Sequence, residues 1–133
     1  MSIKVILDSN FLFIPSRFRI HIFDELENIL SQRVDLVLLS STYEEIRRIA
    51  EKGSQRTRQQ ASLALKLAEK CRIVRAERGL EETCDDVIVR IAEEWRSPVA
   101  TNDEVLRRRL RNINVPVIYL RQKSRLEMEG GLP

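Results

Sequence analysis

The feature that most constrains this chain is a short apolar run near its start that leads directly into Asp8, Ser9 and Asn10. A short apolar run bounded by polar residues is typical of a buried parallel strand, here predicted over residues 3–10. In open α/β sheets, ligands bind at the carboxyl ends of the strands. The sequence therefore predicts that Asp8 lies at the functional edge of a parallel sheet.

The rest of the chain alternates apolar strands with amphipathic helices. Further strands are predicted at residues 34–39, 71–74, 99–101 and 115–120. Helices are predicted between them, at residues 15–30, 41–53, 54–70, 83–95 and from 102 or 103 to about 112. This alternation is typical of βαβ units. We predict an α/β fold with three layers, α/β/α, around a central and mostly parallel sheet.

A length of 133 residues with 43% hydrophobic residues indicates one domain, over residues 1–121. Residues 122–133 are polar and contain a Gly-Gly pair, so we expect a loose tail. Membrane spans and a signal peptide are not expected, because the apolar runs are short and the chain starts directly with a strand. The two cysteines match neither a metal site nor a disulfide framework, and a cytoplasmic location is expected.

Acidic residues follow a strand or begin a helix in four separate segments. They are Asp8, Glu44 with Glu45, Asp85 with Asp86, and Asp103. Helix dipoles favour acids at helix starts, which explains some of these residues without a function, but not Asp8. Carboxylates that meet at one sheet edge repel one another unless a cation holds them. Because the ligands are all oxygens, this pattern predicts a site for Mg²⁺ or Mn²⁺.

Helix geometry separates the two members of each acidic pair. Glu44 stands three residues after Ser41, the spacing of a capping box, whereas Glu45 shares a face with Ile49 and can point toward the sheet. Asp86 stands at the same distance from Thr83, which favours Asp85 for the site. We predict Glu45 and Asp85 as functional, and Asp86 stays open as an alternative to Asp85.

Other chemistries lack essential residues. The chain has no Walker lysine motif and no Gly-x-Gly-x-x-Gly. Its single histidine, His21, falls within a predicted helix and excludes histidine-rich zinc sites. A Ser-His-Asp arrangement has no independent support.

Arginine makes up 18 of the 23 basic residues, and several arginines follow the acidic segments. Arginine binds phosphate in bidentate fashion, so we expect salt-sensitive RNA binding by these residues. Aromatic residues are only 5% of the chain, which argues against a base-stacking surface. Pairing with nearby glutamates is the alternative. The candidates for binding RNA are Arg47, Arg48, Arg107, Arg108 and Arg111.

Four segments together resemble the acidic motifs of PIN-domain ribonucleases, in the family's order. They are Leu-Asp-Ser-Asn at 7–10, Tyr-Glu-Glu-Ile at 43–46, Cys-Asp-Asp-Val-Ile at 84–88 and Ala-Thr-Asn-Asp at 100–103. The resemblance covers residues 4–121. It implies a parallel sheet between helices, a homodimer, and divalent-metal-dependent cleavage of single-stranded RNA. By motif position, the implied metal ligands are Asp8, Glu45, Asp85 or Asp86, and Asp103, supported by Ser9, Asn10 and Thr101.

Residues 100–120 further resemble the branch that processes small-subunit ribosomal RNA, although the basic N-terminal segment of its larger members is missing. The resemblance therefore implies a metal-dependent endoribonuclease, with ribosomal RNA precursors as one substrate class. A toxin nuclease with an antitoxin partner is one alternative. A non-catalytic RNA-binding factor for ribosome assembly is another.

Overall fold

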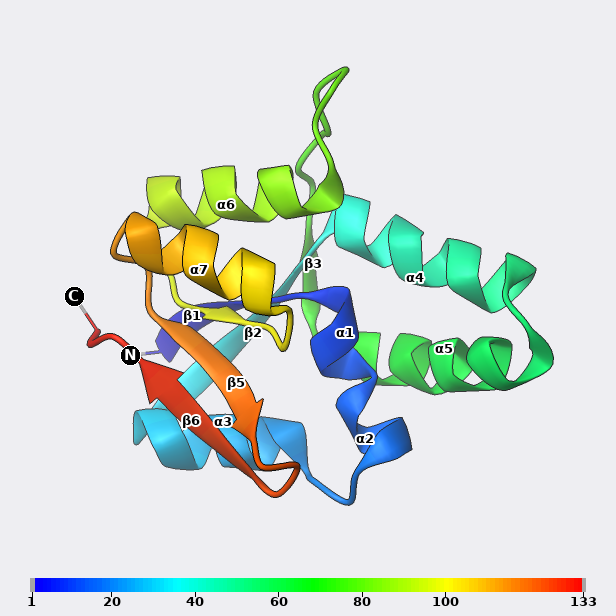
Figure 1. Ribbon diagram of the computed structural model, residues 1–133, viewed down its shortest axis with the longest axis horizontal. Helices are drawn as coiled ribbons and strands as arrows, with labels where there is room; N and C mark the ends of the chain where they lie inside the picture. The colour runs from blue at the N-terminus through cyan, green and yellow to red at the C-terminus, as the bar shows by residue number, and fades with distance from the viewer. Residues whose placement is uncertain (1, 133) are drawn as a thin grey trace.

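The computed structural model describes residues 2–132 (Figure 1). Its elements, in chain order, are β1 (Ser2–Leu7), α1 (Ser9–Leu12), α2 (Ile14–Arg17), α3 (Ile22–Leu30), β2 (Arg33–Leu39), α4 (Ser40–Lys52), α5 (Gln55–Ala68), β3 (Arg72–Val74), α6 (Cys84–Trp95), β4 (Val99–Ala100), α7 (Glu104–Asn112), β5 (Val117–Arg121) and β6 (Arg125–Glu129). The alternation of strands and helices expected from the sequence is present.

The strands form one sheet in the order β3-β2-β1-β4-β5-β6. The first five strands are parallel, and β6 is antiparallel to β5, so the expectation of a mostly parallel sheet is confirmed. Strand β1 lies inside the sheet, where Ile6 is in register with Val37 of β2 and with Val99 of β4. The carboxyl ends of β1, β2 and β4 therefore meet at one edge.

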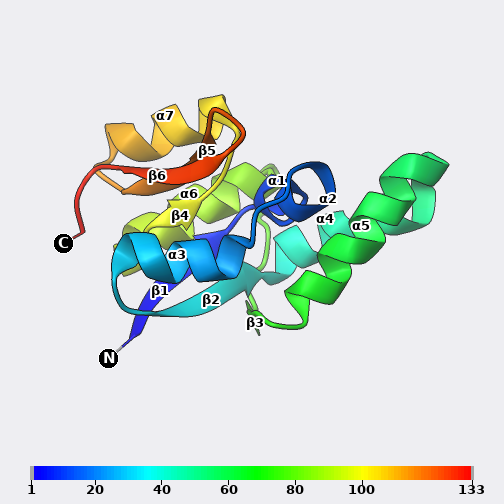
Figure 2. The same ribbon diagram turned by 90° about the horizontal axis from the view of Figure 1, so that it is seen from below.

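Helices cover both faces of the sheet, which gives the three predicted layers (Figures 1 and 2). Successive side chains of β1 point to opposite faces of the sheet, as in any pleated strand. Val5 and Leu7 pack in the core shared with α1, α2, α3 and α5. Ile6 packs in the opposite core, shared with α6 and α7. All three are fully buried, so β1 holds the two cores together.

One strand end and one helix differ clearly from the sequence prediction. Strand β1 ends at Leu7, because the Asp8 side chain accepts a hydrogen bond from the Ser9 amide and begins α1. The single helix predicted over residues 15–30 is divided into α2 and α3, since Phe18 has an extended backbone conformation. Asp8 therefore stands at a strand-to-helix junction.

The prediction of a loose C-terminal tail is wrong. Residues Arg125–Glu129 form β6, which is antiparallel to β5. Val117 lies opposite Glu129 at one end of this pairing, and Arg121 lies opposite Arg125 at the other. Leu126 is 7% exposed and joins the core beside α3. One buried leucine and backbone pairing along five residues therefore order a segment whose sequence is mostly polar.

Helices α4 and α5 form a hairpin that extends beyond the sheet at its β3 side, as both ribbon views show (Figures 1 and 2). The hairpin is anchored by Ile46, Ala61, Ala64 and Ala68, which belong to the core shared with α1. Within residues 2–132, no helix has the length and apolar character needed to cross a membrane.

Candidate active site

Asp8 lies at the centre of a polar cluster at the carboxyl edge of the sheet. It is only 5% exposed. Its Oδ1 accepts a hydrogen bond from the Ser9 amide at 2.8 Å, and its Oδ2 accepts bonds from Thr101 Oγ1 at 2.7 Å and from Asn10 Nδ2 at 3.1 Å. These three donors fix both oxygens of a buried carboxylate in one orientation.

Thr101 joins the ends of β1 and β4. The side chain is fully buried, and its hydroxyl donates to Asp8 while accepting the Asp103 amide at 3.0 Å. Asp103 in turn begins α7, because its Oδ1 accepts the amide of Leu106 at 3.0 Å. One hydroxyl therefore links the carboxylate of Asp8 to the backbone of Asp103.

Asn10 and Asn102 extend this network to β5. Asn10 Oδ1 accepts the amide of Asn102 at 2.9 Å, and Asn102 Oδ1 accepts the amide of Leu120 at 2.8 Å. Asn10 is the residue of this pair that the sequence predicts as polar support, whereas Asn102 is not among the predicted site residues. The position of Asn102 between Thr101 and Asp103 is the sequence signal that could have identified it as a site residue.

Glu45 reaches the cluster from α4. Its Oε1 accepts a hydrogen bond from Ser9 Oγ at 2.6 Å, so the carboxylate points toward the end of β1. The capping box predicted for Ser41 and Glu44 is wrong. Helix α4 begins at Ser40 with Leu39 as its N-cap, and Glu44 is exposed and pairs with Arg47 at 3.5 Å.

The predicted capping box at the start of α6 is confirmed. Thr83 Oγ1 accepts the Asp86 amide at 3.1 Å, and Asp86 Oδ2 accepts the Thr83 amide at 2.9 Å. Asp86 also accepts a bond from Arg109 Nη2 at 2.8 Å. These partners lower the pKa of Asp86, the Thr83 amide most strongly.

Asp85 has a different environment, although it is the next residue to Asp86. Burial raises its pKa, and the negative charges of Asp103 and Glu45 raise it further. Burial also raises the pKa of Asp8 to about 6, with additional contributions from the charges of Asp85 and Glu45. The charges of Asp85 and Glu45 thus act on Asp8, and the charges of Asp103 and Glu45 act on Asp85. We call these four acids the carboxylate site: Asp8, Glu45, Asp85 and Asp103.

The carboxylate site offers only oxygen ligands, the type that Mg²⁺ and Mn²⁺ prefer. The raised pKa values of Asp8 and Asp85 are those of acids that a bound cation would stabilise in their charged form. Across residues 2–132, however, no three His, Cys, Asp or Glu side chains converge closely enough to hold a metal ion. The donor chemistry fits a divalent cation, and hydrogen bonds from Ser9, Asn10 and Thr101 orient the central carboxylate of Asp8.

A groove of about 480 Å³ borders the carboxylate site over the carboxyl ends of β2 and β3. Glu45 lines both the site and this groove, which we call the α4 groove. Its lining residues are Ser40, Ser41, Glu44, Glu45, Arg48, Ala76, Glu77, Arg78 and Cys84. Arg78 was not predicted as a site residue, because residues 77–82 have only the pattern of a polar loop. Cys84 begins α6 beside Asp85 and was not predicted to line a groove.

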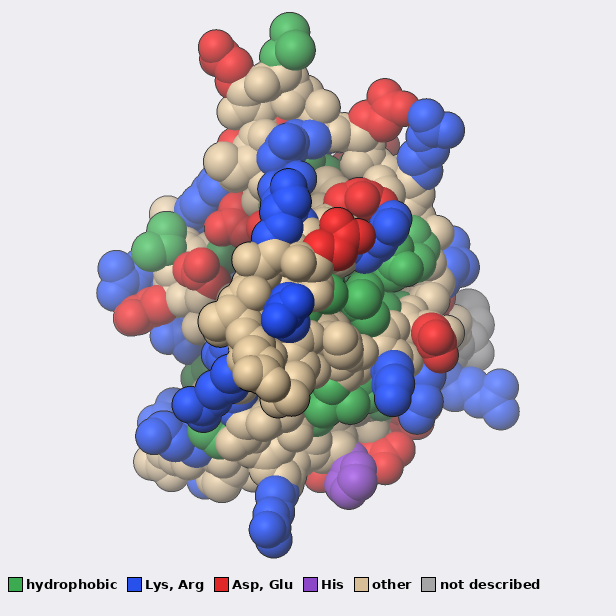
Figure 3. Space-filling model, turned by 90° about the vertical axis from the view of Figure 1, so that its right-hand side faces the viewer, with side chains coloured by type: hydrophobic (Ala, Val, Ile, Leu, Met, Phe, Trp, Pro, Cys, Tyr) green, Lys and Arg blue, Asp and Glu red, His purple; other side chains and the backbone are tan. Residues whose placement is uncertain are grey.

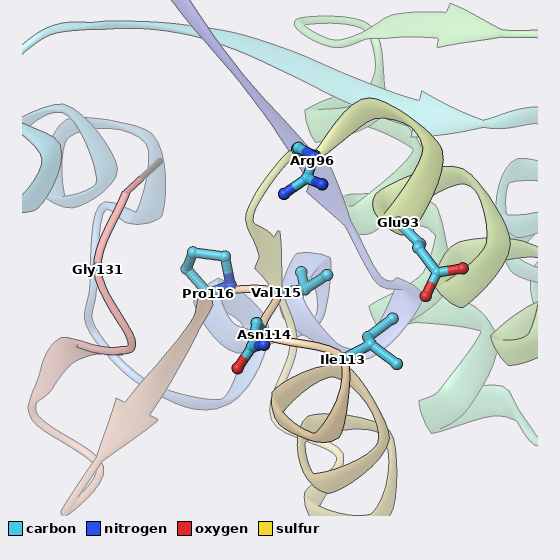
Figure 4. Close-up of a pocket in the computed structure, with 7 residues that line it drawn as sticks. All are labelled: Glu93, Arg96, Ile113, Asn114, Val115, Pro116 and Gly131. Atoms are coloured by element: carbon cyan, nitrogen blue, oxygen red, sulfur yellow. The ribbon is translucent and has the colours of Figure 1, made fainter.

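A second hollow, of about 510 Å³, lies at the other end of the strands (Figure 4). Arg96 precedes β4 and Pro116 precedes β5, so this hollow faces the amino ends of the strands. Glu93 is its one acidic lining residue. The hollow therefore lacks the carboxylates that define the carboxylate site.

Four of the five arginines expected to bind RNA pair with acids of this chain. Arg47 pairs with Glu44, and Arg108 pairs with Glu104 at 2.9 Å. The other two paired arginines are Arg107 and Arg111, which both pair with Glu129 of β6, at 3.8 and 3.7 Å. Arg48 has no ion pair with any residue in the described chain. The structure thus separates Arg48 from the rest of the predicted set.

Comparisons with known proteins agree with this geometry. Residues 5–123 match the model of a family described as "PIN like domain". The chain is 30% identical over 128 residues to "Ribonuclease VapC4" of Methanocaldococcus jannaschii, covering 96% of this chain and 97% of that protein. The structure described as that of "the PIN domain endonuclease Utp24" superposes with a TM-score of 0.80 at 22% identity, covering 97% of this chain and 92% of that chain.

Proposed function

The chain belongs to the PIN-like domain family and is a nuclease, and from this premise we propose that it is an endoribonuclease that uses Mg²⁺ or Mn²⁺. The observation that carries the proposal is the placement of Asp8, a buried carboxylate held by three donors at the carboxyl edge of the sheet. The relative with 30% identity is named a ribonuclease, which supports RNA as the substrate.

Asp8, Glu45, Asp85 and Asp103 are the residues that would hold the cation. When bound, a divalent cation supplies positive charge that neutralises the substrate phosphate and favours formation of a hydroxide nucleophile from water. Asp86 is the weaker candidate, because the Thr83 amide and Arg109 already occupy its carboxylate oxygens. The same amide and guanidinium hold Asp86 in the capping position.

The remaining residues of the site position these carboxylates. Ser9 orients Glu45 through its hydroxyl and Asp8 through its amide. Thr101 links the carboxylate of Asp8 to the backbone of Asp103. Such supporting contacts to metal-binding carboxylates orient the ligands and tune their basicity.

The first test is cleavage of a single-stranded RNA oligonucleotide in Mg²⁺ or Mn²⁺ by the wild type and by Asp8→Asn. Cleavage that requires the metal and is lost in Asp8→Asn is the expected result. Asp24→Asn, which removes an exposed acid of α3, is the matched control and should cleave normally. Metal-independent binding of RNA without cleavage would instead support the non-catalytic assembly factor.

We further propose ribosomal RNA precursors as a substrate class, on the resemblance of residues 100–120 to the branch that processes small-subunit ribosomal RNA. Comparison of cleavage of such a precursor with cleavage of an unrelated RNA of equal length tests this. Preference for the unrelated RNA, or strong inhibition by a small protein encoded beside this chain, would favour the toxin nuclease.

We propose a homodimer in the cytoplasm as the working state. The two cysteines, Cys71 and Cys84, are free thiols, which is consistent with a reducing compartment. Light scattering coupled to gel filtration measures the molar mass directly. A mass of about one chain at all accessible concentrations would contradict the dimer.

A further inference from the structure

The arginines of α7 are engaged by acids of the same chain. Arg107 lies 4.2 Å from the Tyr119 ring centroid and pairs with Glu129. Arg111 pairs with Glu129 and donates to the carbonyl of Val115 at 3.2 Å. A phosphate that approached these side chains would have to displace existing partners. Helix α7 is therefore a weaker phosphate-binding surface than its sequence indicates.

Two arginines of the α4 groove are in the opposite situation. Arg48 and Arg78 both line the groove, and neither has an ion pair within residues 2–132. Three acids also line the groove, and each has a partner other than Arg48 or Arg78. Glu77 pairs with Arg75 at 2.7 Å, Glu44 pairs with Arg47 at 3.5 Å, and Glu45 accepts a bond from Ser9. The groove thus presents two uncommitted guanidinium groups beside the carboxylate site.

The loop that carries Arg78 is held in place by its own contacts. Its base is attached to α4 where Ser40 Oγ donates to the Ala76 carbonyl at 3.2 Å and accepts the Ala76 amide at 3.0 Å. Arg90 binds both carboxylate oxygens of Glu82 at 3.0 Å and donates to the Glu77 carbonyl at 2.9 Å. These bonds fix the loop on both sides of Arg78.

The basic surface continues from the groove along α4. Arg48 also lines a neighbouring shallow hollow with Lys52, one helical turn further on. Residues four apart lie on the same face of a helix. Figure 3 shows this end of the molecule, where Lys and Arg side chains are spread over the surface and acidic side chains lie between them. Arg47, Glu44 and Glu51 line the same hollow, and Arg47 pairs with both acids. Arg48 and Lys52 are therefore the basic side chains that lead from Glu45 toward the end of the α4–α5 hairpin.

We propose that the substrate strand lies in the α4 groove, with Arg48 and Arg78 binding phosphates next to the one that is cleaved. This inference rests on the proposed nuclease function and specifies how that site takes single-stranded RNA. Basic side chains placed along a groove contact the phosphates of a single strand without sequence preference. In the α4 groove Arg48 and Arg78 are the side chains that can do so. In this arrangement the RNA lies beside Glu45 and does not cross α7.

The test measures RNA affinity as a function of salt concentration. Fluorescence anisotropy of a labelled single-stranded RNA, with chelator present to prevent cleavage, gives the slope of log K against log salt. That slope falls by about 0.7 for each phosphate contact removed from a single strand. We expect Arg48→Gln/Arg78→Gln to reduce the slope by about 1.4, and Arg48→Lys/Arg78→Lys to retain it.

Arg33→Gln/Arg96→Gln is the matched control, because it removes two exposed arginines at the amino ends of the strands. Neither forms an ion pair within the described residues. An equal slope in the groove variant and the wild type, or an equal loss in the control, would overturn the inference. A larger loss in Arg108→Gln than in the groove variant would do the same and place the RNA on α7.

The cleavage assay separates this inference from the proposed function. A wild type that cleaves RNA, together with a groove variant of unchanged slope, overturns the groove path alone. A wild type that neither binds nor cleaves RNA overturns both. Thermal unfolding of each variant, which should match the wild type because both groove side chains are exposed, shows that the fold is retained.

Discussion

The hydroxyl of Thr101 donates to Asp8 Oδ2 at 2.7 Å and accepts the amide of Asp103 at 3.0 Å, so one buried oxygen connects the ends of β1 and β4. Thr101 and Asp8 are 93 positions apart in the sequence. Their bond lowers the pKa of Asp8 and opposes the effect of burial. Thr101 is thus the group that keeps a buried acid closer to its charged form.

Thr101→Val tests this relationship, because valine keeps the shape of threonine without the hydroxyl. We expect a loss of about 2 kcal/mol in the free energy of unfolding, since a charged acceptor and a backbone amide lose their partner. The pKa of Asp8 should rise, which moves the pH profile of cleavage to higher pH. Thr101→Ser keeps the hydroxyl and should retain the wild-type profile. An unchanged profile in Thr101→Val would contradict this role.

The pKa of Asp8 predicts how stability depends on pH. Because the folded-state value of about 6 exceeds the ordinary value of 3.8, the folded state binds the proton more tightly. The free energy of unfolding should fall by roughly 3 kcal/mol as the pH rises from below 4 to above 6, at 1.36 kcal/mol per pKa unit.

Asp8→Asn removes this titration. Urea unfolding of both proteins between pH 4 and pH 7 should therefore show the stability of the variant, relative to wild type, increasing with pH. A difference that stays constant over this range would show that Asp8 does not titrate as described.

Addition of Mg²⁺ or Mn²⁺ should stabilise the wild type, because a cation removes the repulsion between Asp8, Asp85 and Glu45. A ligand at one hundred times its dissociation constant stabilises the folded state by about 2.7 kcal/mol. Thermal unfolding measures this effect without any RNA. Asp8→Asn should show a clearly smaller shift, whereas an equal shift in both proteins would place the cation elsewhere.

Asp85 and Asp86 should differ in what their substitution changes. Asp85→Asn is expected to reduce cleavage by at least a factor of about 10, equivalent to 1.4 kcal/mol, with little loss of stability. Asp86→Asn is expected to lower the melting temperature, because it weakens the cap on Thr83 and the pair with Arg109. Kinetics and thermal unfolding of the two variants separate these roles. Reversal of the two results would make Asp86 the functional acid.

The C-terminal strand should contribute to stability. Leu126→Ala removes a side chain that is 7% exposed, and we expect a loss of about 2 kcal/mol in the free energy of unfolding. Val105→Ala, at a position that is 66% exposed, is the control and should change stability little. Equal stability of Leu126→Ala and the wild type would show that β6 is dispensable.

Local signals in the sequence predicted local structure well. The strands of the parallel sheet follow from apolar runs, and the Thr83–Asp86 capping box follows from a spacing of three residues. The same spacing failed at Ser41 and Glu44, because α4 begins directly at the end of β2 with Leu39 as its N-cap. Spacing identifies a capping box only where the helix start is already known.

Long-range contacts could not be predicted from the same signals. Strand β6 has one buried leucine, and its order depends on pairing with β5, which a polar sequence does not indicate. Because β6 was missed, the pairing of Arg107 and Arg111 with Glu129 was missed as well. The bond between Thr101 and Asp8 likewise depends on strand order, which periodicity does not give.

The hydrogen bonds around Asp8 also determine when the site can form during synthesis of the chain. The bond from Thr101 needs residue 101, and Asn102 is held by the amide of Leu120. A growing chain that ends before residue 101 therefore has the local donors of Asp8, the Ser9 amide and Asn10, but lacks the bond from Thr101. Because the full network extends to Leu120, the site should form late in translation, after most of the domain has been synthesised.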